Sequence, residues 1–423
     1  ATTTTAPSAA TTLTPPGAET SAASTAPPAE SPVPETVAQP SPATPSPDAA
    51  AESPLILPKD LSVWGMFMAA DIVVKAVKRL KERGLKDFLC VFVGEDRGRT
   101  HYTGALGLMT LREAIAGFYT ARWQAAVDPA RIAVTPGASG ALLLALGLLA
   151  GPGDEVLMAD PGYPCNRHFT AFCDARAVSI PVDADCGFQL TLDAVERHAT
   201  PATRAVLIAS PSNPTGTVIS AGELERIRDW CRAQGVALIV DEIYLALTYD
   251  GDERTAARWD DVFVVNSFSK YFLMTGWRLG WLAAPAWAMP ALEKLAQNLF
   301  LAAPTPAQYA ALAAFSHPTL AQLEARKAEL RARRDFLLPA LRARGFAIPI
   351  VPQGAFYLYA DCSRFTADSR TFASQLLDQA GVAVTPGIDF GHRYAERHIR
   401  VAYTQPLPRL AEALARIDRF LQA

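Results

Sequence analysis

The sequence predicts an α/β fold, in which a mostly parallel sheet carries helices on both faces and a smaller α+β lobe follows. Three observations lead to this prediction. Helical and strand-like segments alternate from residue 104 onward, as they do in βαβ units. Unusual polar residues stand at the ends of several of these strands. The C-terminal part mixes a long charged helix with short strands, which indicates a separate lobe.

The composition is that of a globular protein with a low-complexity extension. The chain has 423 residues, of which 50% are hydrophobic and 19% charged, enough for two or three domains. Residues 1–58 have five acidic residues and no Lys, Arg or aromatic residue, so the net charge of -3 leaves +2 for residues 59–423. A nearly neutral body gives no electrostatic basis for nucleic-acid binding. The longest apolar run, 141–150, is too short to span a membrane.

The cysteines and histidines give no sign of a metal site. The six cysteines lie far apart with no CxxC pair, and the six histidines include no HExxH motif. This pattern indicates neither a disulfide framework nor zinc ligands. We therefore expect no metal, and reduced thiols in a cytoplasmic protein.

The first hundred residues are predicted to stand apart from the α/β body. Residues 1–58 are rich in Ala, Thr, Pro and Ser, so we expect a disordered tail. In the segment 59–104, the stretch DLSVWGMFMAADIVVKAV (60–77) resembles the N-terminal segment of ExbB-type biopolymer-transport proteins. The charged KRLKERG that follows cannot enter a membrane, so we expect no membrane span. An amphipathic first helix of the body is the alternative interpretation of 60–77.

The body is predicted element by element from apolar periodicity and turn residues. Helical spacing covers 106–123, 137–149 and 223–234, and short apolar strands are expected at 131–135, 155–158, 205–209, 237–240 and 262–266. The C-terminal helix is expected at 320–344, with strands at 355–359 and 398–403. We therefore divide the body into a large domain, 105–302, and a small one, 303–423. In such parallel sheets, ligands bind at the carboxyl ends of the strands.

Four motifs lie at these strand ends. They are SPSNPTG (210–216), DEIY (241–244), SFSKYFLMTGWRLGW (267–281) and IRVAY (399–403). Each alone is weak, because a turn, a helix cap, a surface lysine or an ion pair would explain it. Together and in this order, they resemble the fold-type I pyridoxal-phosphate enzymes, the class I/II aminotransferases. The resemblance extends over about residues 99–423.

The resemblance implies which residues hold the cofactor ring. Lys270 would bind pyridoxal 5'-phosphate as a Schiff base and then transfer the substrate's α-proton, with a pKa lowered by burial and nearby cations. Asp241 would keep the pyridine nitrogen protonated by charge attraction. Asn213 and Tyr244 would donate hydrogen bonds to the ring oxygen. Tyr163, in DPGYP, matches the aromatic residue that stacks on the ring.

Further residues match the sites for phosphate and substrate. TPGASG (135–140) precedes an apolar helix, and the phosphate ligands implied there and in the lysine motif are Gly137, Ala138, Ser139, Ser267 and Arg278. Arg400 would bind the substrate α-carboxylate through its planar guanidinium, and Asn213 is implied as a further substrate-binding residue. Tyr102 resembles the tyrosine that reaches the neighbouring subunit's phosphate, which implies a homodimer with shared active sites.

The N-terminal end departs from the family pattern. VFVGED (91–96) is followed directly by RGRTHYT, without the proline and helix that family members have there. Gly94 would match the glycine that closes over substrate. Without these features, and with the unusual stretch 60–77, the N-terminal end looks recombined. Because that segment forms part of the substrate lid in the family, substrate closure and turnover are in question.

These features predict an aminotransferase that moves an amino group from an L-amino acid to a 2-oxo acid in ping-pong order. A β-lyase on the same scaffold and a catalytically impaired cofactor-binding protein are the alternatives. The substrate side chain stays open. Trp64, Phe356 and Tyr357 would suit a neutral or aromatic substrate, but would equally suit the core.

Overall fold

The structure is a computed structural model of the whole chain, and the residues it describes are 101–251 and 253–422. The predictions for the tail 1–58 and for residues 59–100, including Gly94 and Trp64, therefore concern residues outside these ranges.

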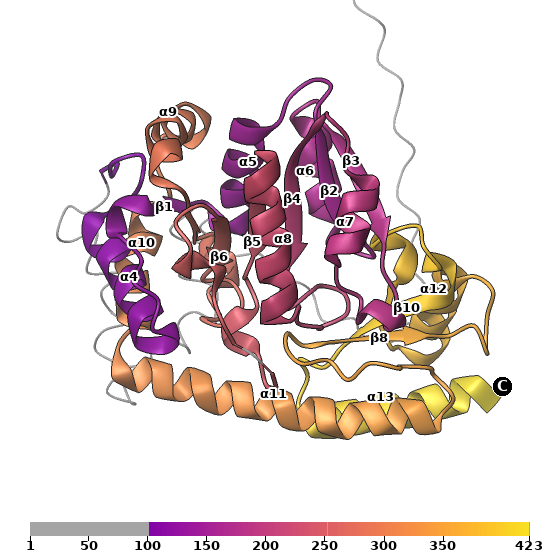
Figure 1. Cartoon of the computed structure of the whole chain (residues 1–423). Coiled ribbons are helices and arrows are strands. Elements are labelled where there is room, and N and C mark those ends of the chain that lie inside the picture. The colour runs from indigo at the N-terminus through magenta and orange to yellow at the C-terminus, as the bar shows by residue number, and fades with distance from the viewer. Residues whose placement is uncertain (1–100, 252, 423) are drawn as a thin grey trace, which may run out of the picture. The chain divides into compact units, whose positions relative to one another are not determined.

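A seven-stranded sheet forms the large part of the fold (Figure 1). Its strands are β1 (Ile132–Thr135), β2 (Glu155–Asp160), β3 (Arg176–Pro181), β4 (Thr203–Ala209), β5 (Ala237–Asp241), β6 (Phe263–Ser267) and β7 (Gly280–Ala283). The spatial order is β1-β7-β6-β5-β4-β2-β3. Neighbours from β6 to β3 pair in parallel, and β7 alone runs antiparallel to both of its neighbours. The predicted mostly parallel sheet is confirmed.

Helices cover both faces of this sheet because its strands are apolar on both sides. Along β5, Leu238 and Val240 belong to one buried cluster and Ile239 to another. The first cluster includes Ile227 of α8 (Ala221–Gln234), and the second includes Leu142 of α5 (Gly137–Leu149). The alternation along one strand thus buries residues on opposite faces, each under its own helices.

The remaining helices complete the two layers and the C-terminal part. They are α4 (Met109–Trp123), α6 (Pro164–Phe172), α7 (Leu192–His198), α9 (Met289–Phe300), α10 (Thr305–Ala314), α11 (His317–Ala343), α12 (Ser369–Ala380) and α13 (Leu407–Gln422). Among the helices of the described ranges, none has the length and apolar character needed to cross a membrane.

The C-terminal part has its own small sheet and core. Strands β8 (Tyr357–Asp361), β9 (Thr385–Pro386) and β10 (His398–Ala402) form an antiparallel sheet in the order β8-β10-β9. This confirms the smaller α+β portion. Helix α11 contributes Leu323 to the core of the large sheet and Leu337 to the C-terminal core, so one helix joins the two. In Figure 1 it runs along the lower edge of both.

Most predicted elements differ from the observed ones by one to three residues at their ends. The strand expected at 355–359 begins and ends two residues later, and its late start has a local cause. Ala355 has a φ of +57°, a left-handed conformation that cannot continue a strand, and β8 therefore begins at Tyr357.

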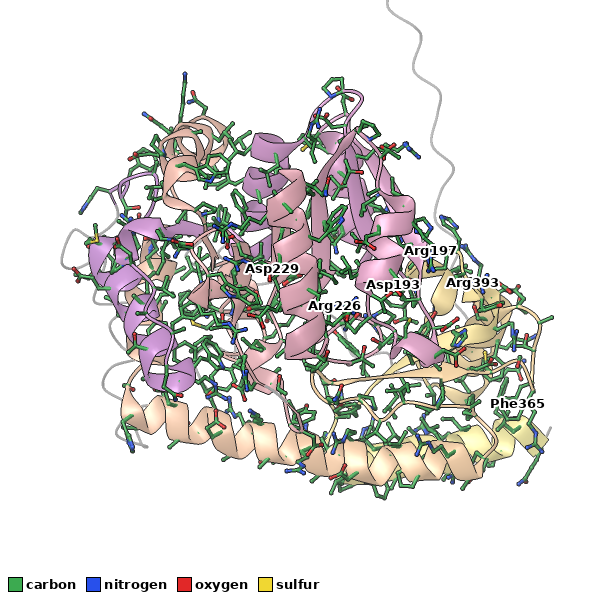
Figure 2. The ribbon with its side chains drawn as sticks, in the orientation of Figure 1. Asp193, Arg197, Arg226, Asp229, Phe365 and Arg393 are labelled. Carbon is green, nitrogen blue, oxygen red and sulfur yellow. The ribbon has the colours of Figure 1, made fainter. Side chains whose placement is uncertain are left out.

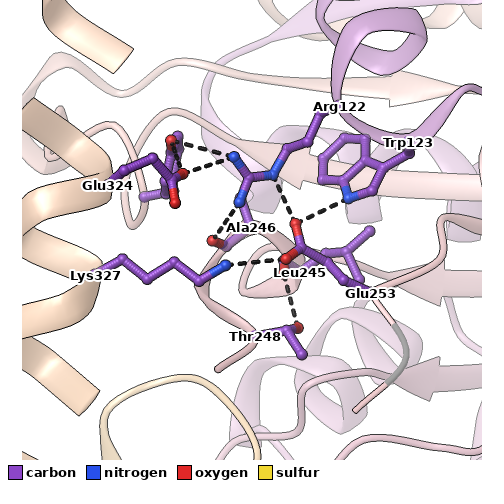
Figure 3. A network of polar contacts seen from close by, with 9 residues as sticks. Arg122, Trp123, Leu245, Ala246, Thr248, Glu253, Glu324 and Lys327 are labelled. Carbon is purple, nitrogen blue, oxygen red and sulfur yellow. Dashed lines mark hydrogen bonds and ion pairs between the residues drawn. The ribbon is translucent and has the colours of Figure 1, made fainter. Parts of the chain in front are cut away.

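A network of polar contacts fixes α11 against the large sheet (Figure 3). Arg122 of α4 donates to Glu253 at 2.6 Å and to Glu324 of α11 at 2.7 Å. Trp123 and Lys327 also donate to the Glu253 carboxylate, at 3.0 and 2.9 Å. Only 17% of the Arg122 side chain and 24% of the Glu253 side chain are exposed, so solvent screens this pair weakly.

Substituting Arg122 with methionine should lower the free energy of unfolding by about 1–3 kcal/mol, because it removes one donor from the part-buried Glu253 carboxylate and another from the more exposed Glu324. Thermal denaturation measures this as a lower midpoint. The control is Arg226→Met, which removes the ion pairs of the exposed Arg226 with Glu223 in the same helix, α8, and with Asp193 of α7; Figure 2 labels Arg226 and Asp193. It should cost less than about 1 kcal/mol. Equal effects of the two substitutions would contradict the assignment of the network.

Candidate active site

A cavity of about 340 Å³ lies at the carboxyl ends of strands β4 and β5. It brings together residues from the motifs that the sequence singled out and from both sheets. Nine predicted site residues line it: Ala138, Ser139, Tyr163, Asn213, Asp241, Tyr244, Lys270, Arg278 and Arg400. The cavity thus lies at the strand ends, among the residues that the sequence singled out.

The lysine and the carboxylate of this cavity have shifted pKa values. Burial lowers the pKa of Lys270, and the cations Arg400 and Arg278 lower it further, against the opposing effect of Asp241. This is the direction expected from the sequence. Burial raises the pKa of Asp241 to about 6, although its Oδ1 accepts a hydrogen bond from the Ile243 amide at 3.0 Å. A buried carboxylate in this state is suited to a cationic partner in the cavity.

A tight turn before α5 forms a cradle for an anion. Gly137 has a φ of +74°, and a Cβ built there would lie 2.7 Å from Nη2 of Arg278. A Cβ on Gly280 would lie 2.6 Å from the carbonyl carbon of Gly137 and 2.7 Å from the amide nitrogen of Ala138. Two glycines thus allow Arg278 and β7 to approach the start of α5. Amides at a helix start next to a guanidinium fit a phosphate group.

Two hydrogen bonds hold the Arg400 guanidinium in place, but one of its buried donors has no partner. Its Nη1 donates to Asn213 Oδ1 at 2.9 Å, and its Nη2 donates to Thr385 Oγ1 at 3.2 Å. Its Nε is buried and has no hydrogen-bond partner. The guanidinium carbon also lies 4.3 Å from the ring centroid of Tyr357 and 4.7 Å from that of Phe390. A buried donor without a partner is costly, so an anionic acceptor in the cavity would stabilise it.

Sequence reasoning did not assign three polar side chains that line the cavity, namely Ser269, Thr275 and Tyr357. Ser269 and Thr275 lie inside the lysine motif, so their place in the sequence was a signal. Tyr357 was left open between substrate pocket and core. Its hydroxyl forms a hydrogen bond with the Tyr244 hydroxyl at 2.9 Å.

Three predicted site residues do not line the cavity in this chain. The Ser267 hydroxyl is buried, donates to the carbonyl of Leu279 at 3.0 Å and is hydrogen-bonded to the Ser269 hydroxyl, also at 3.0 Å. Gly137 lies behind Arg278, and the Tyr102 side chain is 76% exposed outside the cavity. Their predicted contacts with cofactor stay predictions.

Fold and site together define a class of protein. A lysine and a buried carboxylate share one cavity, an anion cradle opens a helix beside them, and all lie at the carboxyl edge of a mostly parallel sheet. This arrangement is that of a fold-type I pyridoxal-phosphate enzyme, and the residues present fit that cofactor's ring, phosphate and aldehyde.

The chain belongs to the family "Aminotransferase class I and II", whose sequence profile matches residues 67–417. It is thus a pyridoxal-phosphate-dependent transaminase. The match begins before residue 99, where the sequence resemblance was placed, and includes most of the stretch 60–77. The resemblance of that stretch to transport proteins stays a prediction outside the described residues.

Individual relatives agree with the family. The chain is 42% identical over 323 residues to a valine–pyruvate aminotransferase of Mycobacterium tuberculosis, covering 76% of this chain and 83% of the relative. It is 35% identical over 324 residues to an arginine–pyruvate transaminase of Pseudomonas aeruginosa, covering 76% and 82%. Among solved structures, an aminotransferase from Mycobacterium tuberculosis has a TM-score of 0.76 at 40% identity, covering 78% and 86% of the two chains.

A second buried carboxylate lies next to the site and predicts a pH effect on stability. Burial raises the pKa of Glu242 to about 8, although its carboxylate accepts hydrogen bonds from Thr255 and from the Ala256 amide. The folded chain therefore holds a proton that the unfolded chain loses near its ordinary pKa of 4.5. The resulting stability is fully present below that value and is lost as the pH rises through about 8.

We expect the melting temperature of the wild type to fall, relative to Glu242→Gln, by roughly 5 °C or more between about pH 5 and about pH 9. Glutamine does not titrate, its amide oxygen can accept from the Ala256 amide, and its NH2 group can donate to the Thr255 hydroxyl. The exposed Glu196→Gln variant is the control and should follow the wild type at every pH. Parallel curves for wild type and Glu242→Gln would show that Glu242 carries no extra proton.

Proposed function

We propose that this transaminase works in ping-pong order with Lys270, Asp241 and Arg400 as its central residues. Pyridoxal phosphate, when bound, supplies an electron sink for the substrate α-carbon. An L-amino acid gives its amino group and leaves as a 2-oxo acid, and a second 2-oxo acid receives the group. The observation that carries the proposal is the meeting of all three residues in one cavity.

Lys270 would hold the cofactor through Nζ and then move the α-proton of the substrate. A base for this step must be neutral for part of its time at working pH. Burial together with the cations Arg400 and Arg278 lowers the pKa of Lys270 toward that range.

Asp241 would hold the proton on the cofactor's ring nitrogen, since a buried carboxylate is stabilised by a facing cation. Asn213 and Tyr244 would donate to the ring oxygen, and Tyr163 would stack on the ring. The phosphate would lie at the start of α5, bound by the amides of Gly137, Ala138 and Ser139, the Ser267 hydroxyl and the Arg278 guanidinium.

Arg400 would bind the α-carboxylate of both substrates. Its Nη1 is engaged by Asn213, whereas its buried Nε has no partner. A carboxylate that accepts from Nε would satisfy this donor by a charge-assisted hydrogen bond. Asn213 thereby fixes the guanidinium that orients the substrate.

Pyruvate is the proposed amino acceptor to test first. Two relatives are named for amino transfer with pyruvate, one from valine and one from arginine. Valine, arginine and an aromatic amino acid should be compared as donors, with 2-oxoglutarate as the alternative acceptor. Alanine formation from pyruvate supports the proposal. A coloured, loaded protein that transfers no amino group with any pair would favour the catalytically impaired alternative.

A single-turnover experiment distinguishes a transaminase from a β-lyase on the same scaffold. With an amino acid alone, a transaminase should convert its bound cofactor to the amino form and stop after one equivalent of 2-oxo acid. Continuous release of pyruvate and ammonia from a sulfur amino acid, without any 2-oxo acceptor, would instead identify a lyase.

We also propose a homodimer, with Tyr102 reaching the phosphate site of the partner subunit. Support comes from the 76% exposure of Tyr102 and its position outside its own chain's cavity. Light scattering should then give twice the chain mass of 45.3 kDa, and a monomer would contradict the proposal.

A cytoplasmic location is proposed because the described cysteines are all free thiols. The domain limits 105–302 and 303–423 are part of the same proposal.

A further inference from the structure

Two buried phenols meet at the wall of the cavity. Tyr244 follows β5 of the large sheet, and Tyr357 begins β8 of the small sheet. Their side chains are 3% and 5% exposed, and their hydroxyl oxygens lie 2.9 Å apart. Within the described residues, each hydroxyl makes this one hydrogen bond. Both residues line the cavity, so a ligand there can reach the pair.

We propose that Tyr357 is a positioning residue of the active site, which donates its hydroxyl proton to Tyr244 and so directs the Tyr244 proton toward the cofactor's ring oxygen. This inference rests on the proposed function, because it assumes that Tyr244 contacts that oxygen.

The direction of the hydrogen bond follows from proton counting. Burial raises the pKa of Tyr244 and of Tyr357, so both phenols stay protonated at working pH. One of the two protons lies between the oxygens, and the other is free. If Tyr244 donated to Tyr357, it would have no proton for the cofactor. The opposite arrangement makes a chain from Tyr357 to Tyr244 to the ring oxygen, in which each bond strengthens the next.

The charges around the pair favour this direction. The Arg400 guanidinium lies over the Tyr357 ring at 4.3 Å, and a nearby cation makes a phenol a better donor. Arg400 acts on Tyr244 as well, but Asp241 raises the pKa of Tyr244 and not that of Tyr357, so its negative charge makes the Tyr244 phenol the poorer donor and the better acceptor of the two. Tyr357 is thus the donor of the pair on electrostatic grounds.

The Tyr357 ring has a second role through Arg400. The guanidinium carbon lies over the rings of Tyr357 and Phe390, at 4.3 and 4.7 Å from their centroids. Such stacking fixes the plane of the fork that binds a carboxylate. One side chain therefore supports both the cofactor contact and the substrate contact, and the hydroxyl and the ring can be tested apart.

The hydroxyl is tested with Tyr357→Phe in the cofactor-loaded protein. The readout is the pH midpoint at which the absorbance of the bound cofactor changes. A donor at the ring oxygen stabilises the deprotonated form, so a weakened Tyr244 donor should raise the midpoint. We expect a rise of roughly half to one pH unit. The Michaelis constant for the amino donor should stay within about twofold, because the ring over Arg400 is retained.

A double-variant cycle makes this result specific. Tyr244→Phe should raise the midpoint by more than Tyr357→Phe does, and the double variant should match Tyr244→Phe alone, since Tyr357 acts through Tyr244. The matched control is Tyr359→Phe, two residues along β8. The Tyr359 hydroxyl is buried without a hydrogen-bond partner and does not line the cavity, so its loss should leave the midpoint unchanged.

An unchanged midpoint in Tyr357→Phe, or shifts that simply add in the double variant, would overturn the inference while leaving the proposed function intact. A wild-type protein that binds no pyridoxal phosphate would instead refute the proposed function, and a Tyr244→Phe variant with the wild-type midpoint would refute the role proposed for Tyr244.

Tyr357→Leu removes the ring as well and should raise the Michaelis constant about tenfold over Tyr357→Phe. If the Michaelis constant of Tyr357→Leu equalled that of Tyr357→Phe, the Tyr357 ring would have no role in substrate binding.

Discussion

Replacement of Lys270 by alanine should reduce turnover by more than about 10⁴-fold, the largest effect of any substitution we expect in this chain. Alanine has no nitrogen to hold the cofactor and none to move the substrate proton. The absorbance of the loaded protein should change as well, because free and lysine-bound cofactor absorb differently. Turnover is measured with pyruvate as acceptor, and absorbance on the gel-filtered protein.

The control for this experiment is Lys294→Ala, on the exposed side of α9. It removes an equal side chain and charge far from the chemistry, so its turnover should equal that of the wild type. Activity of Lys270→Ala within about tenfold of wild type would refute the assignment of the lysine.

Substitution of Asp241 with asparagine should lower kcat by roughly 10³-fold, the second largest expected effect. Asparagine fills the same space but carries no charge, so it cannot hold a proton on the cofactor's ring nitrogen. Its amide oxygen can still accept the hydrogen bond that the Asp241 carboxylate accepts from the Ile243 backbone amide. The fold should therefore survive, and the loss should appear in kcat rather than in the melting temperature.

Asp241→Glu separates charge from shape at this position. The longer side chain keeps the carboxylate but must fit a fully buried site, so partial activity is expected. Glutamate should retain more activity than asparagine. If asparagine were the more active of the two, the carboxylate charge would not be what the site uses.

Local patterns predicted the central elements of the fold well. Helix α5 begins and ends at the expected residues, since its apolar run follows a glycine turn and stops at Ala150. Strand β5 was expected at 237–240 and extends one residue further, to Asp241. Strands β3 and β7 were not expected. β3 is an edge strand with exposed positions, and β7 has four residues, too few for periodicity to show.

The candidate site was predictable to the extent that strand ends define it. Residues far apart in sequence, such as Asn213 and Arg400, were expected to meet and do so at 2.9 Å. Tyr357 could not be placed, because its position depends on how the small sheet packs on the large one. The orientation of Ser267 toward Leu279 rather than the cavity depends on β7, which local sequence did not indicate.

The close packing of Gly137 and Gly280 has a consequence for how fast and how tightly the cofactor binds. Where β7 meets the turn that would hold the phosphate, backbone lies against backbone, so this part of the site needs no side chain to be ordered. Little conformational entropy is then lost when the ligand arrives, so more of the interaction energy appears as affinity. Dissociation of the cofactor from such a rigid binding turn should be slow, so the protein should keep the colour of the bound cofactor through prolonged dialysis.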